Sequence, residues 1–192
     1  MTIEIIPTFG LYCKKTDVMI MVSKVLKKVV VSALMAALVC VATMVIQIPS
    51  PMNGYVNLGD CFVLLSGWLL GPVFGAAASG VGSMLTDLLM GYAVYAPGTL
   101  IIKGIMGALC AVILKAFKPS ATAAGYIVSG LASEAVMVLG YFGYAALLLG
   151  KGGAAALSIP GNCVQAAAGL VLGTVLAMIF EKTGLKKKLL NI

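Results

Sequence analysis

Residues 57–92 read NLGDCFVLLSGWLLGPVFGAAASGVGSMLTDLLMGY. Two long apolar runs meet at Gly71-Pro72, where a Gly ends one helix and a Pro opens the next. The only charged residues of this stretch are Asp60 and Asp87. Because a segment so poor in charge cannot cover itself with polar groups in water, it predicts helices that lie in lipid.

The composition of the whole chain agrees with this interpretation. Of its 192 residues, 61% are hydrophobic and 10% are charged, and the mean hydropathy is +1.11. A soluble domain has about 25% charged residues. We therefore expect an all-α integral membrane protein, since the apolar runs far exceed the roughly 10-residue alternating strands of a membrane barrel. The absence of histidine excludes Ser-His catalysis and His-based metal sites, so we expect neither an enzyme nor a metal site.

The limits of the apolar runs predict six transmembrane helices. We expect these helices at about residues 24–48, 57–71, 72–92, 98–117, 121–146 and 160–181. Several are near the ~20 residues that cross a bilayer, although the second is short. We interpret residues 1–23 as an N-terminal cytoplasmic tail or the result of a misassigned start codon. Residues 24–181 form the transmembrane domain, and 182–192 a basic cytoplasmic tail.

The placement of the lysines predicts the orientation in the membrane. All 13 basic residues are lysines, and with six helices eleven of them lie on the side shared by both termini. Lys151 lies on the opposite side, and Lys103 lies inside a helix. By the positive-inside rule, both termini are cytoplasmic. This distribution, without any arginine, argues against a nucleic-acid partner.

Several polar side chains inside the predicted helices are candidates for function, because a charge in hydrocarbon costs at least ~2.5 kcal/mol. The ionisable ones are Asp60, Asp87, Lys103 and Glu134, and their uncharged neighbours are Tyr141, Asn162 and Gln165. Most of them fall in the outer half of the membrane. We expect a polar cavity that opens outward and is closed below by apolar packing.

These residues allow structural and functional interpretations. Asp60 could cap or brace the start of its helix, and an Asp87–Lys103 ion pair is as plausible as contact of either residue with a ligand. Glu134, Tyr141, Asn162 and Gln165 are the preferred ligand contacts. Trp68 is expected to be an interfacial anchor. The candidates for stacking on a ligand are therefore the tyrosines Tyr55, Tyr92, Tyr95, Tyr141 and Tyr144.

Small residues at four-residue spacing indicate close helix contacts. Gly67, Gly71 and Gly75 suit packing within the protein. On the first helix, the small residues could instead meet a partner protein; they are Ser32, Ala33, Ala36 and Ala37.

Four segments, in this order, resemble the S components of energy-coupling factor (ECF) transporters. They are GYVNLGDCFVLLSGWLLGPVFGAAASGVGSMLTDLLMGY, YAPGTLIIKGIMG, SEAVMVLGYF and SIPGNCVQAAAG. The likeness covers residues 24–181 and is nearest to the branch that handles vitamins and their precursors, such as hydroxymethylpyrimidine or pyridoxine. It implies a substrate-binding subunit of a bacterial cell-membrane importer.

The resemblance also implies roles for segments of this chain. Residues 49–56, with Asn53 and Tyr55, would form a lid, and the last three helices would supply most contacts to the substrate, among them Lys103. The first helix would meet a transmembrane coupling subunit that works with two cytosolic ATPases. The sequence contains no GxxxxGK[ST] phosphate loop, so ATP would be used by the partner subunits only, and we expect no bound cofactor.

Two other functions are compatible with an intramembrane cavity. A stand-alone facilitator or ion-coupled carrier of a small polar metabolite could use Asp87 and Glu134 as ion sites. A membrane enzyme of lipid metabolism is disfavoured, since the chain lacks histidine and acid-rich metal motifs.

Overall fold

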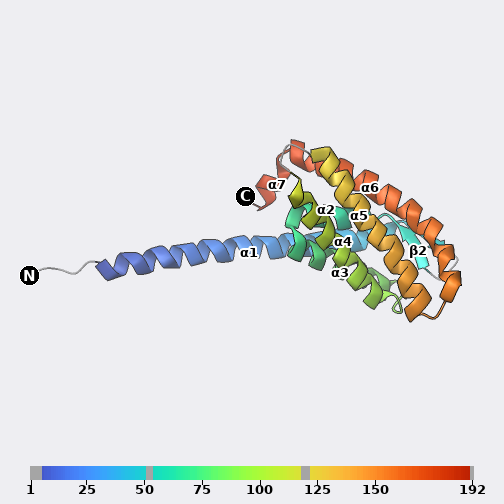
Figure 1. Ribbon diagram of the computed structural model, residues 1–192. Helices are drawn as coiled ribbons and strands as arrows, with labels where there is room; N and C mark the ends of the chain where they lie inside the picture. Colours follow the sequence, from blue (N-terminus) through green and yellow to red (C-terminus); the bar gives the residue numbers. More distant parts are fainter. Residues whose placement is uncertain (1–5, 51–53, 118–121, 191–192) are drawn as a thin grey trace, which may run out of the picture.

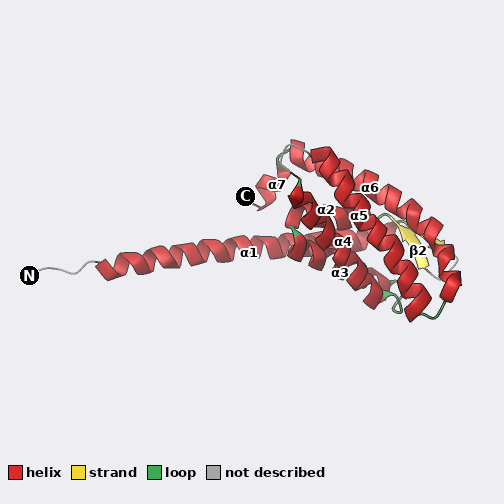
Figure 2. Cartoon of the chain, viewed as in Figure 1, coloured by secondary structure: helices red, strands yellow, loops and turns green. Residues whose placement is uncertain are grey.

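The computed structural model describes residues 6–50, 54–117 and 122–190. Its helices are α1 (Ile6–Val45), α2 (Asp60–Leu70), α3 (Pro72–Leu89), α4 (Ala96–Ala116), α5 (Thr122–Gly143), α6 (Ile159–Lys182) and α7 (Leu185–Leu190), with a π-helical turn, η1 (Tyr144–Leu148), and a 3₁₀ segment, η2 (Gly152–Ser158). Two short strands, β1 (Gln47–Ser50) and β2 (Gly54–Asn57), form an antiparallel hairpin in which Ile48 faces Val56. Figure 2 shows that helix dominates the rest of the described chain.

Helices α1 to α6 pack into one bundle with the hairpin at one end (Figure 1). At the other end lie α7 and the point where α1 leaves the bundle towards the N-terminus. Within the bundle, α3 packs on α1, α2 and α4, and α6 packs on α2 and α5. The alternation of helix directions therefore brings the C-terminal ends of α1, α3 and α5 to the hairpin, together with the N-terminal ends of α2, α4 and α6.

Some helix limits differ from those expected from sequence. The first helix extends back to Ile6, so most of the predicted tail is helical. Residue Asn57, expected to begin the second helix, ends a strand instead, and its side-chain oxygen accepts a hydrogen bond from the Gly59 amide at 2.8 Å. This local turn competes with helix formation and delays the helix start to Asp60.

The helix lengths show a multi-pass membrane protein. Among the described residues, four apolar segments are long enough to span a bilayer: Met21–Val45, Ala96–Ala116, Ala123–Leu148 and Gly152–Lys182. The 11 residues of α2 reach only about 16 Å, and the 18 residues of α3 about 27 Å. A hydrocarbon core is about 30 Å thick, so the number of membrane crossings is treated below as part of the proposed topology.

Glycines allow α2, α3 and α4 to touch through their backbones. A Cβ added to Gly75 of α3 would lie 2.6 Å from the Cα of Gly67 on α2. A Cβ added to Gly107 of α4 would lie 2.7 Å from the carbonyl oxygen of Gly75. The expectation of internal packing is confirmed for Gly67 and Gly75, although they act across two helices. It is not confirmed for Gly71, where an added Cβ would have nothing within 4 Å.

Replacement of Gly75 with alanine should force α2 and α3 apart, because the added methyl group meets backbone that cannot rotate away. We expect a loss of about 1–3 kcal/mol in stability, as for other overpacked interiors. Thermal unfolding of the purified protein in detergent measures this loss. Gly143→Ala is the matched control, since a Cβ there would have nothing within 4 Å; equal melting temperatures for both variants would contradict the assigned contact.

Apolar side chains fill the bundle beneath the hairpin end. Val39, Val63 and Met106 are fully buried in one cluster. Trp68 is also buried, with 3% of its surface exposed, and its indole N–H donates to the Ser129 hydroxyl at 2.9 Å. The expectation that Trp68 anchors at the membrane interface is therefore wrong, because the indole found its hydrogen-bond partner inside the bundle.

Candidate functional site

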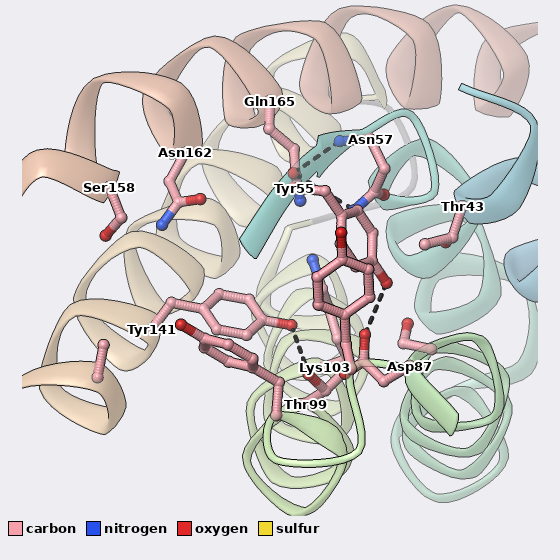
Figure 3. Close-up of a pocket in the computed structure, with 14 residues that line it drawn as sticks. Thr43, Tyr55, Asn57, Asp87, Thr99, Lys103, Tyr141, Ser158, Asn162 and Gln165 are labelled. Atoms are coloured by element: carbon pink, nitrogen blue, oxygen red, sulfur yellow. Dashed lines mark hydrogen bonds between the residues drawn. The ribbon is translucent and has the colours of Figure 1, made fainter. Parts of the chain in front are cut away.

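A cavity lies at the hairpin end of the bundle (Figure 3). Its lining combines hydroxyl, amide, phenol and charged groups with one small apolar residue: Thr43, Tyr55, Asn57, Ser83, Asp87, Tyr92, Tyr95, Thr99, Lys103, Tyr141, Ala145, Ser158, Asn162 and Gln165. These side chains come from β2, the α3–α4 connection, η2 and the neighbouring ends of α1, α3, α4, α5–η1 and α6. The predicted gathering of polar residues at one end of the bundle is confirmed.

The hairpin is fixed to the cavity wall on two sides. On one side, the Tyr55 hydroxyl donates to Asp87 Oδ1 at 2.6 Å, and the Tyr55 ring centre lies 4.8 Å from that of Tyr92. On the other side, the backbone N–H of Asn57 donates to Gln165 Oε1 at 2.9 Å. Burial, followed by the Asp87 carboxylate, raises the pKa of Tyr55 above its ordinary value, so its phenol stays protonated and able to donate.

A buried ion pair forms the floor of the cavity. Lys103 of α4 pairs with Asp60 Oδ1 at the start of α2, and Gln165 of α6 donates to Asp60 Oδ2 at 2.7 Å. Lys103 is 3% exposed and Asp60 is fully buried. Asp60 thus joins α2 to α4 and α6, whereas the sequence interpretation had it cap or brace only the start of its own helix. The alternative prediction, an ion pair between Lys103 and Asp87, is wrong, because Lys103 pairs with Asp60 instead.

Glu134 lies outside the residues that line the cavity. It is 3% exposed, and a Cβ added to Gly169 would fall between its carboxylate, at 2.9 Å, and the Cβ of Asp60, at 2.7 Å. Neither carboxylate oxygen has a hydrogen-bond partner among the described residues. Glu134 therefore sits beside the floor ion pair, and its contact with a substrate stays a prediction.

Sequence comparison identifies the family. Residues 23–182 match the family model described as "ECF-type riboflavin transporter, S component". The chain belongs to this S component family. It is a subunit of a transporter and not an enzyme.

Two relatives cover most of this S component. It is 42% identical over 146 residues to the "Uncharacterized protein in gap 3'region" of Pyrococcus woesei, an alignment that covers 75% of this chain and 95% of the relative. It is 32% identical over 168 residues to the "Thiamine precursor transporter HmpT" of Lactococcus lactis subsp. cremoris, covering 86% of this chain and 95% of the relative. The family match and the Lactococcus lactis relative support a substrate-binding subunit of a vitamin-type transporter.

The S component cavity brings together most of the substrate contacts expected from sequence. Those that line it are Tyr55, Lys103, Tyr141, Asn162 and Gln165, and Tyr92 and Tyr95 add aromatic surface. The Tyr144 hydroxyl instead donates to the Val94 carbonyl at 2.8 Å, and Tyr144 is not among the lining residues. Asn53 lies outside the described residues.

The sequence interpretation missed several lining residues of the S component: Thr43, Asn57, Ser83, Thr99 and Ser158. Ser83 carried a usable signal, because it stands four residues before Asp87 and so shares its helix face. Asp87, for which a structural role and contact with a ligand were both left open, also lines the cavity. Thr43 gave no signal, since its contribution depends on where α1 ends.

The small residues of α1 divide between two faces of the S component. Ser32 is buried, and its hydroxyl donates to the Lys28 carbonyl at 2.7 Å. Ala36 is half-buried, and a Cβ added to Gly82 of α3 would lie 2.5 Å from its carbonyl oxygen. Ala33 and Ala37 are exposed. Ser32 and Ala36 therefore face the bundle, which corrects their assignment to a partner-facing surface.

Proposed function

We propose that this S component captures a small water-soluble vitamin or vitamin precursor from outside a bacterial cell. It then delivers this substrate inward together with a transmembrane coupling subunit and two cytosolic ATPases, which use ATP. The observation that carries the proposal is the polar cavity beneath the hairpin, in a bundle whose two main hydrophobic clusters lie outside that cavity. The family match supplies the transport context.

The proposed topology has six membrane crossings and cytoplasmic termini, in the bacterial plasma membrane. It is supported by the position of α7 beside α1, at the end opposite the hairpin (Figure 1). In this orientation the lysine-rich segments 14–28 and 182–188 lie on the cytoplasmic side and the cavity faces outward. The short α2 and α3 cross less hydrocarbon than the other helices.

The lining suits an aromatic heterocycle of modest size, such as an aminopyrimidine or a pyridine alcohol. Tyrosines offer ring faces, and Asn162 and Gln165 carry amides that donate and accept hydrogen bonds. The cavity volume is about 60 Å³, whereas occupied ligand pockets measure about 300–1,000 Å³. Substrate entry therefore requires the hairpin, which is held through Tyr55 and Asn57, to move aside. The hairpin then closes again over the substrate.

Identification of a co-purified ligand tests this function most directly. The protein would be purified gently from its membrane, and any bound small molecule would be released and identified by mass spectrometry. A stoichiometric vitamin-like compound would support the binding-subunit role. Proteoliposomes then separate the mechanisms: uptake only with the coupling subunit and ATPases supports the importer, whereas uptake by this chain alone would replace it with the facilitator or ion-coupled carrier.

A further inference from the structure

The α3 wall of the cavity carries two buried oxygens that lack hydrogen-bond partners. Ser83 and Asp87, four residues apart on one face of α3, each line the cavity and are 3% exposed. Ser83 Oγ and Asp87 Oδ2 have no partner among the described residues. Because a buried polar group without a partner costs about 1–3 kcal/mol, and more when charged, this pair suggests that a bound molecule supplies the missing hydrogen bonds.

The charged and polar groups around Asp87 also indicate that a bound molecule contacts it. Its Oδ1 accepts the Tyr55 hydroxyl, and Thr99 and Lys103 of α4 lie close to its carboxylate. The ion pair of Lys103 nevertheless goes to Asp60. Within the described residues, Asp87 is therefore a buried carboxylate without a cation of its own, and this wall of the cavity accepts hydrogen bonds.

We propose that Ser83 and Asp87 form a recognition subsite for an amino group, or a ring N–H, carried by an aromatic heterocycle. This inference rests on the proposed substrate-binding function and assigns one end of the substrate. Carboxylate and hydroxyl oxygens accept hydrogen bonds from such donors, and the rings of Tyr55 and Tyr92 stand beside the subsite. Asn162 and Ser158 lie across the cavity from Asp87 (Figure 3), where they are available to the opposite end of the ligand.

The subsite also connects the ligand to the hairpin. Asp87 uses Oδ1 to hold Tyr55 and keeps Oδ2 for the ligand, so one carboxylate fixes both. An analogue without the N–H group leaves Oδ2 buried and unpartnered, and a site built around a hydrogen bond rejects such an analogue strongly. The subsite therefore discriminates between ligands of the same shape that differ in one donor.

Titration calorimetry of the purified full chain with matched ligand pairs tests the subsite. The pairs are 4-amino-5-hydroxymethyl-2-methylpyrimidine and its 4-methyl analogue, pyridoxamine and pyridoxine, and riboflavin and its N3-methyl derivative. For the pair that fits the cavity, we expect the member with the additional N–H donor to bind about 10- to 100-fold more tightly. Asp87→Asn should abolish or reverse this preference, because the amide presents an N–H where the carboxylate presented an oxygen.

Two further variants keep the test independent of any folding defect in Asp87→Asn. Ser83→Ala should reduce the preference by about 3- to 10-fold. Thr174→Val is its matched control, since the Thr174 hydroxyl is also buried and unpartnered among the described residues but lies outside the cavity lining. This control should leave the preference unchanged.

The outcomes distinguish the subsite from the function on which it rests. Equal binding of both members of every pair, or a preference that survives Asp87→Asn and Ser83→Ala, would overturn the subsite while leaving the substrate-binding function in place. Absence of binding by all probes, together with absence of any co-purified ligand, would overturn both. Tyr55→Phe should weaken both members alike without changing their ratio, because it loosens the hairpin and leaves Asp87 Oδ2 in place.

Discussion

Replacing Lys103 with methionine should destabilise the protein by about 3–5 kcal/mol, the usual effect of removing one partner of a buried ion pair. The physical reason is that Asp60, which is fully buried beside the buried Glu134, would lose its cationic partner. The Gln165 hydrogen bond to Asp60 cannot replace a full positive charge. Denaturation of the purified protein in detergent measures the change.

The double variant Asp60→Asn/Lys103→Met provides the control. It removes both charges and leaves a neutral amide that can still bond to Gln165, so most of the lost stability should return. Ligand binding should stay weak in both variants, because Lys103 also lines the cavity. If the double variant were as unstable as the single one, the ion pair would not be the interaction that holds α2 and α4 together.

The sequence predicted where the helices lie better than which side chains pair between them. Gly71-Pro72 marked the α2–α3 junction correctly, since Gly71 has a positive φ of 84° and Pro72 begins α3. The depth of Asp60 and Lys103 along their helices was also predictable from residue counts. Their pairing was not, because it depends on how α2 and α4 rotate about their own axes, which is decided by glycine contacts between helices.

The hairpin shows why short strands escape sequence analysis. Residues 47–50 and 54–57 are too short and too rich in Gly and Pro to carry an alternating pattern. Residues 49–56 were therefore expected to be a loop, and residues 47, 48 and 57 to belong to the flanking helices. Their conformation is set from far along the chain: the Asn57 amide bonds to Gln165, 108 residues away. Thr43 was unpredictable for a similar reason, because its place at the cavity depends on where α1 ends.

The strongest effect on transport is expected from the exposed small residues of α1. Ala33→Leu combined with Ala37→Leu should leave ligand binding unchanged, since both positions lie on the outer face of the bundle and away from the cavity. Uptake that depends on the coupling subunit should fall about tenfold or more, which corresponds to at least about 1.4 kcal/mol of lost association. Leucine prevents the close helix approach that alanines four residues apart allow.

Two controls distinguish docking from folding. Ala167→Leu places the same change on an exposed position of α6 and should spare both binding and uptake. Ala36→Leu, one position away on α1, changes a half-buried residue whose backbone meets Gly82 and should lower the melting temperature instead. Full uptake by the Ala33/Ala37 double variant would move the docking surface to another helix. A loss of both binding and melting temperature would show that this face of α1 packs within the bundle after all.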